Sequence, residues 1–130
     1  MATIKSFEDI ERWKQARDVC KLIGKFINDG RFKKSYRLIN QIDGSSGSIM
    51  DNIAEGFERG SRAEFVLFLG YAKGSCGELR SQLYRALDRN YISEDEFEML
   101  KKSVMNISGL IQNLIRYLQK TKIEGTRKKV

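Results

Sequence analysis

The chain has 130 residues, which suits one domain with a single core. Hydrophobic residues make up 41% of it and charged residues 32%, a composition typical of globular rather than disordered proteins. The formal net charge is +7; there is no histidine, no proline and only two cysteines. These absences exclude a Ser-His-Asp triad, a mixed Cys/His zinc site and a disulfide scaffold.

No apolar run approaches the roughly 18 residues needed to cross a bilayer. The first residues, Met1–Ser6, lack the apolar stretch of a secretory signal. We therefore expect a soluble, cytoplasmic protein. We also expect one domain over residues 1–122 and a flexible basic tail over residues 123–130.

Apolar residues recur at helical spacing in the first half of the chain. One helix is predicted from Phe7 to Asn28, with Ser6 as its N-cap and Asp29-Gly30 as its end. A second is predicted from Lys34 to Phe57. Two glycines within Gly44–Gly47 each cost a helix about 1 kcal/mol, so a break there is the alternative. Because the apolar positions keep one helical phase across the gap, we expect a continuous helix.

Two further helices each begin at a capping box, a serine followed three residues later by a glutamate. The box Ser61–Glu64 starts a helix that runs to about Asn90, and the box Ser93–Glu96 starts one that runs to about Lys120. No segment alternates as a strand would, and short connections favour antiparallel neighbours. The sequence thus predicts an all-α fold, an antiparallel up-down-up-down four-helix bundle.

The third predicted helix has a second unusual face, opposite its apolar stripe. Three glycines and a serine recur on it at helical spacing, and three glycines disfavour a helix by about 3 kcal/mol. A backbone packed closely against this stripe would offset that cost. The neighbour is either the second helix of the same chain or, as we favour, another copy of the chain. The predicted oligomer interface comprises Val66, Leu67, Gly70, Gly74, Gly77, Ser81 and Tyr84.

Positive charge concentrates in two places. Residues 31–37 hold four cations and two aromatics without an acid, and cations at a helix N-terminus oppose the helix dipole. Such residues can neutralise nucleic-acid phosphates while an aromatic ring stacks on a base. The alternative is that Phe32 and Tyr36 close the end of the bundle and the lysines are merely solvated. The candidate nucleic-acid contacts are Arg31, Lys33, Lys34, Tyr36 and Arg37, with Arg127, Lys128 and Lys129 in the tail.

Two charged stripes weaken a direct inference from net charge to nucleic acid. The first predicted helix has a basic face and the second an acidic one, so the stripes are also able to pair between subunits. The basic stripe is Lys14, Arg17, Lys21 and Lys25, and the acidic stripe is Asp43, Asp51, Glu55 and Glu58.

No catalytic constellation is evident. The stretch Gly70–Ser75 lacks the Walker order and falls in mid-helix, where backbone amides are already bonded. Glu64 is explained as a capping residue, and Cys20 and Cys76 fall on apolar stripes, as small buried hydrophobes do. We expect no enzymatic activity, no metal and no cofactor.

Three blocks form an ordered pattern between Phe7 and Ile92. They are Phe7-x-x-Ile10-x-x-Trp13-x-x-Ala16, Ser48-Ile49-x-x-Asn52-Ile53-Ala54-Glu55-Gly56, and Glu64-Phe65-x-x-Phe68-Leu69-x-x-Ala72-x-Gly74-Ser75-x-x-Glu78-Leu79-x-x-Gln82-Leu83. This pattern resembles the 23S rRNA intervening-sequence protein family of four-helix bundles. The resemblance implies a bacterial protein, similar in fold to the accessory variability protein of diversity-generating retroelements.

The same resemblance implies a homopentamer, and nucleic-acid binding is the usual proposal for the family's function. The chain departs from many relatives at Gln41-Ile42-Asp43-Gly44, where they carry a basic pair after Gln-Ile. A contact made by that pair is therefore not implied here. We expect a homo-oligomeric scaffold that binds RNA or DNA through phosphates rather than base readout. The alternative is a protein–protein interaction scaffold with no nucleic-acid role.

Overall fold

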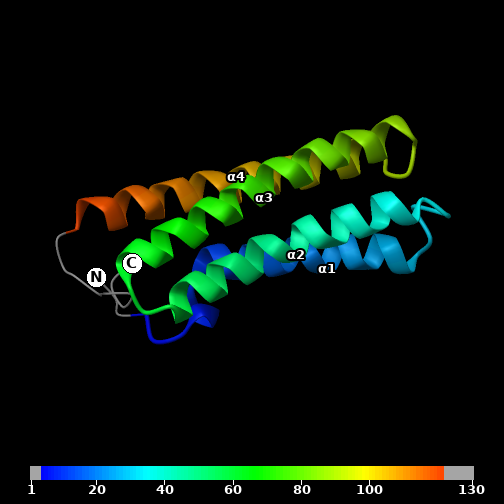
Figure 1. Cartoon of the computed structure of the whole chain (residues 1–130). Helices are drawn as coiled ribbons and strands as arrows, with labels where there is room; N and C mark the ends of the chain where they lie inside the picture. Colours follow the sequence, from blue (N-terminus) through cyan, green and yellow to red (C-terminus); the bar gives the residue numbers. More distant parts are fainter. Residues whose placement is uncertain (1–3, 122–130) are drawn as a thin grey trace.

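The computed structural model describes residues 4–121, in which four long helices form one bundle. Neighbouring helices in the chain pack together, and α1 also packs against α4, which gives an antiparallel up-down-up-down arrangement (Figure 1). The predicted fold class is confirmed, and no helix in this range is long and apolar enough to cross a membrane. The elements are the 3-10 turn η1 (Phe7–Asp9), α1 (Glu11–Asn28), α2 (Tyr36–Glu58), α3 (Arg62–Asp88) and α4 (Glu94–Lys120).

The two ends of the bundle differ in what they hold. The α1–α2 and α3–α4 connections lie together at one end, which we call the loop end (residues 29–35 and 89–93) (Figure 1). The α2–α3 connection, the start of α1 and the end of α4 lie at the other.

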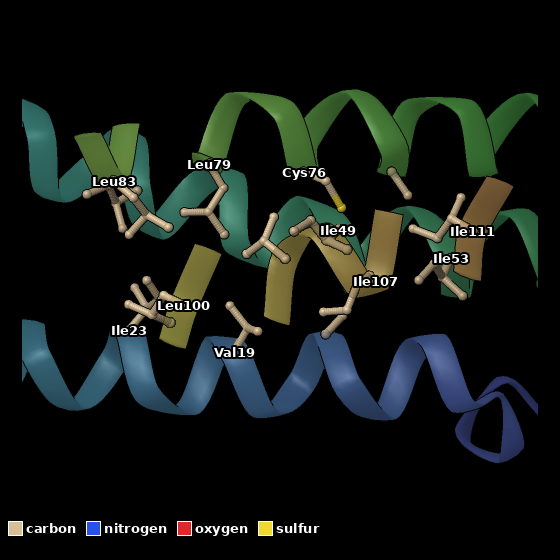
Figure 2. Packing of buried hydrophobic residues seen from close by; sticks show 14 of the residues in the cluster. Val19, Ile23, Ile49, Ile53, Cys76, Leu79, Leu83, Leu100, Ile107 and Ile111 are labelled. Carbon is tan, nitrogen blue, oxygen red and sulfur yellow. The ribbon is translucent and has the colours of Figure 1, made fainter. Parts of the chain in front are cut away.

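The core consists of the apolar stripes that the four helices turn toward one another. These side chains are almost fully buried, and each buried Leu or Ile contributes about 1.5–3 kcal/mol to folding. The stripes at helical spacing therefore account for the bundle. Figure 2 shows residues of all four helices meeting along its axis: Val19, Ile23, Ile49, Ile53, Cys76, Leu79, Leu83, Leu100, Ile107 and Ile111.

Helix α2 runs unbroken through its two interior glycines, as predicted. Ser46 between them and Ser48 beside them form side-chain hydrogen bonds inside the bundle. Ser46 Oγ donates to the carbonyl oxygen of Asp43 at 3.1 Å, and Ser75 Oγ of α3 donates to Ser48 Oγ at 2.9 Å. These polar contacts and the continuous apolar face stabilise the helix where propensity alone would not.

The helix starts agree with the sequence in part. Ser93 and Glu96 form the complete predicted capping box. At the other box, Ser61 Oγ accepts from the Glu64 backbone N–H at 3.1 Å and donates to the Glu64 carboxylate at 3.2 Å. The predicted N-cap Ser6 is wrong: its side chain caps nothing, because residues 7–9 tighten into η1 and α1 begins only at Glu11.

Candidate functional site

The connection between α1 and α2 is tied to α4 by an ion pair. Arg31 Nη1 and Nη2 each donate to a different carboxylate oxygen of Glu96 at 2.7 Å. The same guanidinium lies 4.5 Å from the centre of the Phe26 ring. The bonds from Arg31, and then the backbone N–H of Ser93, lower the pKa of Glu96 to about 2. Arg31 was predicted to contact nucleic acid, but its Nη1 and Nη2 already bind the carboxylate of Glu96.

The two aromatic residues of this connection have opposite environments. Phe32 is 1% exposed and packs edge-on against Tyr91 with ring centres 5.8 Å apart, so it closes the end of the bundle. Ser35 is hydrogen-bonded through its hydroxyl to the Tyr91 hydroxyl and does not cap α2. Tyr36, in contrast, is 65% exposed. The alternative that both aromatics close the bundle therefore holds for Phe32 alone.

Three cations lie close to Tyr36 in the sequence and have no side-chain partner within residues 4–121. The side chains of Lys33, Lys34 and Arg37 are exposed, and none forms an ion pair or hydrogen bond with another residue of the described range 4–121. The first turn of α2 carries no acid. Lys33 has a φ of 53°, a left-handed conformation that is uncommon for a side-chain-bearing residue. We call Lys33, Lys34, Tyr36 and Arg37 the basic cluster.

Arg89 adds a cation at this end that sequence analysis missed. Arg85 donates to Gln41 Oε1 at 2.5 Å, which sets the last turns of α3 beside the first turns of α2. Arg89 is exposed and one turn further on, level with the start of α2. Whether Arg89 lies near the start of α2 depends on the register of α2 against α3, and no local sequence signal reveals that register.

The predicted tail contacts Arg127, Lys128 and Lys129 lie outside the described residues. Helix α4, which leads to them, ends at Lys120, at the end of the bundle opposite the loop end (Figure 1). A helix of its length spans about 40 Å. The described part of the chain thus does not join the two predicted sets of cations into one patch.

The outer face of α3 is open, as the oligomer hypothesis requires. A Cβ added at Gly70, Gly74 or Gly77 would meet no atom of the described residues 4–121 within 4 Å. The alternative that these glycines accommodate α2 is wrong. The glycine at that contact is Gly56, where an added Cβ would lie 2.7 Å from the Cβ of Phe68.

The exposed residues of this face follow a regular spacing. Leu67 and Tyr84 are 49% and 44% exposed, whereas Val66 is only partly exposed and packs against the core, so its predicted place in the interface stays a prediction. The spacing alternates between three and four residues, the pattern of helices packed side by side over several turns. We call this set the α3 seam: Leu67, Gly70, Gly74, Gly77, Ser81 and Tyr84.

The basic stripe of α1 and the acidic stripe of α2 are both exposed. Arg17 lies 5.9 Å from the centre of the Trp13 ring, and Glu55 pairs with Arg59 at 2.9 Å. These interactions join residues of the same helix, so the pairing that the two stripes would make between subunits stays a prediction.

The helix surfaces hold shallow grooves. One groove, of about 380 Å³, lies between α1 and α4 and is lined in part by Val19, Leu22 and Met99. Met99 and Met105 next to it are about half exposed. Among residues 4–121, no three His, Cys, Asp or Glu side chains lie close enough to hold a metal ion.

The two cysteines differ in burial. Cys76 lies in the core, and burial raises the pKa of its thiol to about 12. Cys20 is only half-buried, contrary to its expected core position, and its Sγ donates to the carbonyl oxygen of Ser46 at 3.0 Å. Burial raises the pKa of the Cys20 thiol as well.

The fold and the exposed surfaces define an all-helical bundle protein with a basic loop end and one open helix face. The family model of the 23S rRNA-intervening sequence proteins matches residues 8–113, so the chain belongs to that family. This confirms the resemblance inferred from the sequence blocks.

A solved structure has the same fold. It is a protein of unknown function from the S23 ribosomal protein family of Bacteroides thetaiotaomicron VPI-5482. The TM-score is 0.73 at 23% sequence identity, and the match covers 81% of this chain and 98% of that chain. No curated protein matches the chain.

Proposed function

We propose that this protein is a non-enzymatic, homo-oligomeric scaffold of the cytoplasm that binds nucleic acid through phosphates at its loop end. One observation carries the proposal: the exposed cations Lys33, Lys34 and Arg37 have no acidic partner within residues 4–121. The family description refers to an intervening sequence of 23S rRNA, which supports a nucleic acid as the partner.

Phosphate neutralisation explains this arrangement better than solvation alone. Three unpaired cations within five residues repel one another and oppose the dipole of α2. A phosphate backbone would remove both penalties and release counterions. Arg31 was predicted to share in this contact. Its bonds to Glu96 give it instead the role of holding the connection from which the cations project.

Self-association would explain the α3 seam. Its three glycines weaken α3 by about 3 kcal/mol in propensity terms, and no residue of the described range 4–121 lies within 4 Å of a Cβ added at any of them. A second copy whose helix approached closely would recover this cost and cover Leu67 and Tyr84. An oligomer would also present several basic clusters at once, and multivalency strengthens weak phosphate contacts.

A titration of purified protein with labelled RNA and duplex DNA at several salt concentrations tests the nucleic-acid part. We expect affinity that falls steeply as salt rises. Affinity that ignores ionic strength, or that survives replacement of Lys33, Lys34 and Arg37 by neutral residues, would refute it.

A scaffold that recognises only proteins is the second candidate. The half-exposed Met99 and Met105 beside the α1–α4 groove favour it, because methionine surfaces adapt to the side chains of protein partners. Failure of the nucleic-acid titration at low salt would leave this candidate in place of the first.

A further inference from the structure

We propose that the basic cluster binds an unpaired nucleotide, with the base stacked on the Tyr36 ring and the neighbouring phosphates on Lys33, Lys34 and Arg37. The inference rests on the proposed function and specifies the form of nucleic acid. The preferred ligand is a single strand or an unpaired loop, because a duplex would contact the cations but not stack on the ring.

Tyr36 is 65% exposed, and no other aromatic ring of residues 4–121 packs against its ring. Tyr71 and Tyr84, the other exposed tyrosines in the described range, each have a ring neighbour, Phe68 at 5.4 Å and Phe97 at 4.7 Å. Tyr36 has no aromatic, cation–π or side-chain hydrogen-bond contact within residues 4–121, and it is the most exposed large apolar side chain there. A free, exposed ring is what base stacking requires.

Stacking on a protein ring needs a base whose face is open. Within a duplex both faces of each base are covered by its neighbours, whereas unpaired bases can leave the stack and lie on an aromatic side chain. The cations stand on both sides of Tyr36 in the chain, with Lys34 before it and Arg37 after it. In the proposed complex they contact the phosphates on either side of the stacked base.

The connection that carries the cluster is held in place. It is held by the Arg31–Glu96 ion pair and by the buried Phe32 ring. The backbone N–H of Lys33 also donates a hydrogen bond to the carbonyl oxygen of Gly30 at 3.1 Å. A fixed connection loses little conformational freedom when a ligand binds. The cluster can thus contribute most of its contact energy to affinity.

The test compares one RNA strand in two forms. A 12-nucleotide RNA with a central 2-aminopurine is titrated into the full chain, alone and annealed to its complement, with anisotropy and 2-aminopurine fluorescence as readouts. We expect the wild-type protein to quench 2-aminopurine fluorescence when the base stacks on Tyr36. Tyr36→Ala should abolish this quenching and weaken single-strand binding about tenfold or more, but should leave duplex binding within about twofold. Tyr36→Phe, which keeps the ring, should retain wild-type affinity and quenching.

Two results separate this inference from the proposed function. If wild-type protein binds both forms but Tyr36→Ala changes both equally or neither, stacking is wrong while phosphate binding stands. If wild-type protein binds neither form at low salt, both are wrong. A triple variant, Lys33→Gly with Lys34→Gln and Arg37→Gln, should lose affinity for both forms, and glycine tolerates the positive φ at position 33.

Discussion

Arg31 and Glu96 are joined by two hydrogen bonds of 2.7 Å that fasten the α1–α2 connection to the first turn of α4. Glu96 Oε1 also accepts from the backbone N–H of Ser93 at 2.8 Å. One carboxylate therefore both caps α4 and holds the segment that presents the basic cluster. The pair links residues 65 positions apart and sets the geometry of the loop end.

This pair predicts a pH dependence of stability. The pKa of Glu96 is about 2 in the folded chain and near its ordinary value of 4.5 when unfolded. Its charge therefore stabilises the fold above about pH 4.5, and that contribution is lost as the pH falls toward 2. Glu96→Gln keeps an acceptor for the Ser93 cap but removes the charge.

Urea unfolding at a series of pH values measures the effect. We expect Glu96→Gln to be less stable than wild type at pH 7 and to approach it near pH 2. Parallel stability curves for the two proteins between pH 5 and 2 would contradict the assigned role of the carboxylate.

Gly56 should be intolerant of a side chain. An added Cβ would lie 2.7 Å from Phe68 Cβ and 3.2 Å from Phe65 Cδ1, so α2 and α3 would have to move apart. We expect Gly56→Ala to lower the unfolding free energy by about 1–3 kcal/mol. Gly109→Ala in α4 is the matched control, because its Cβ meets nothing within 4 Å, and it should gain about 1 kcal/mol from helix propensity. Equal effects at the two positions would contradict the close crossing.

The cations of the basic cluster should set the salt dependence of RNA binding. Each phosphate contact lowers the slope of log affinity against log salt by about 0.7 for single strands, so removing Lys33, Lys34 and Arg37 should flatten it by about 2. Arg31→Gln should instead lower stability and leave the slope nearly unchanged. A flattened slope for Arg31→Gln, measured by anisotropy, would show that it contacts phosphate after all.

The cysteines should react slowly in the folded chain. Burial raises the pKa of both thiols, that of Cys76 to about 12, and the thiolate is the reactive form. With a disulfide reagent at pH 8, we expect the half-buried Cys20 to react first and Cys76 to require unfolding. Rapid modification of both in native buffer would contradict the packing around Cys76.

The fold was predictable because the helical spacing of apolar residues can be read from each segment of the sequence by itself. The continuity of α2 followed from matching phases on both sides of Gly44–Gly47, and the box Ser93–Glu96 marked a helix start correctly. The wrong N-cap at Ser6 has a local cause too. Acidic residues such as Glu8 and Asp9 occur both in 3-10 turns and in the first turn of an α-helix. Composition therefore does not tell the two structures apart.

The surface was less predictable because it depends on register between distant segments. Phe32 and Tyr36 are aromatic residues close together in the sequence, but Phe32 packs against the distant Tyr91 and is buried, whereas Tyr36 is exposed. The partner of Arg31 and the placement of Arg89 likewise depend on the α3–α4 connection. Sequence spacing located the cations but not their partners.

The molar mass of the purified protein in solution, measured by light scattering, tests the central claim that another copy covers the α3 seam. We expect several protomers per particle, five if the assembly implied by the family resemblance is correct. Gly74→Leu, whose Cβ would meet nothing within 4 Å among residues 4–121, should reduce the mass to one protomer without loss of helix content. A wild-type protein that stays at the mass of one protomer at high concentration would contradict the account.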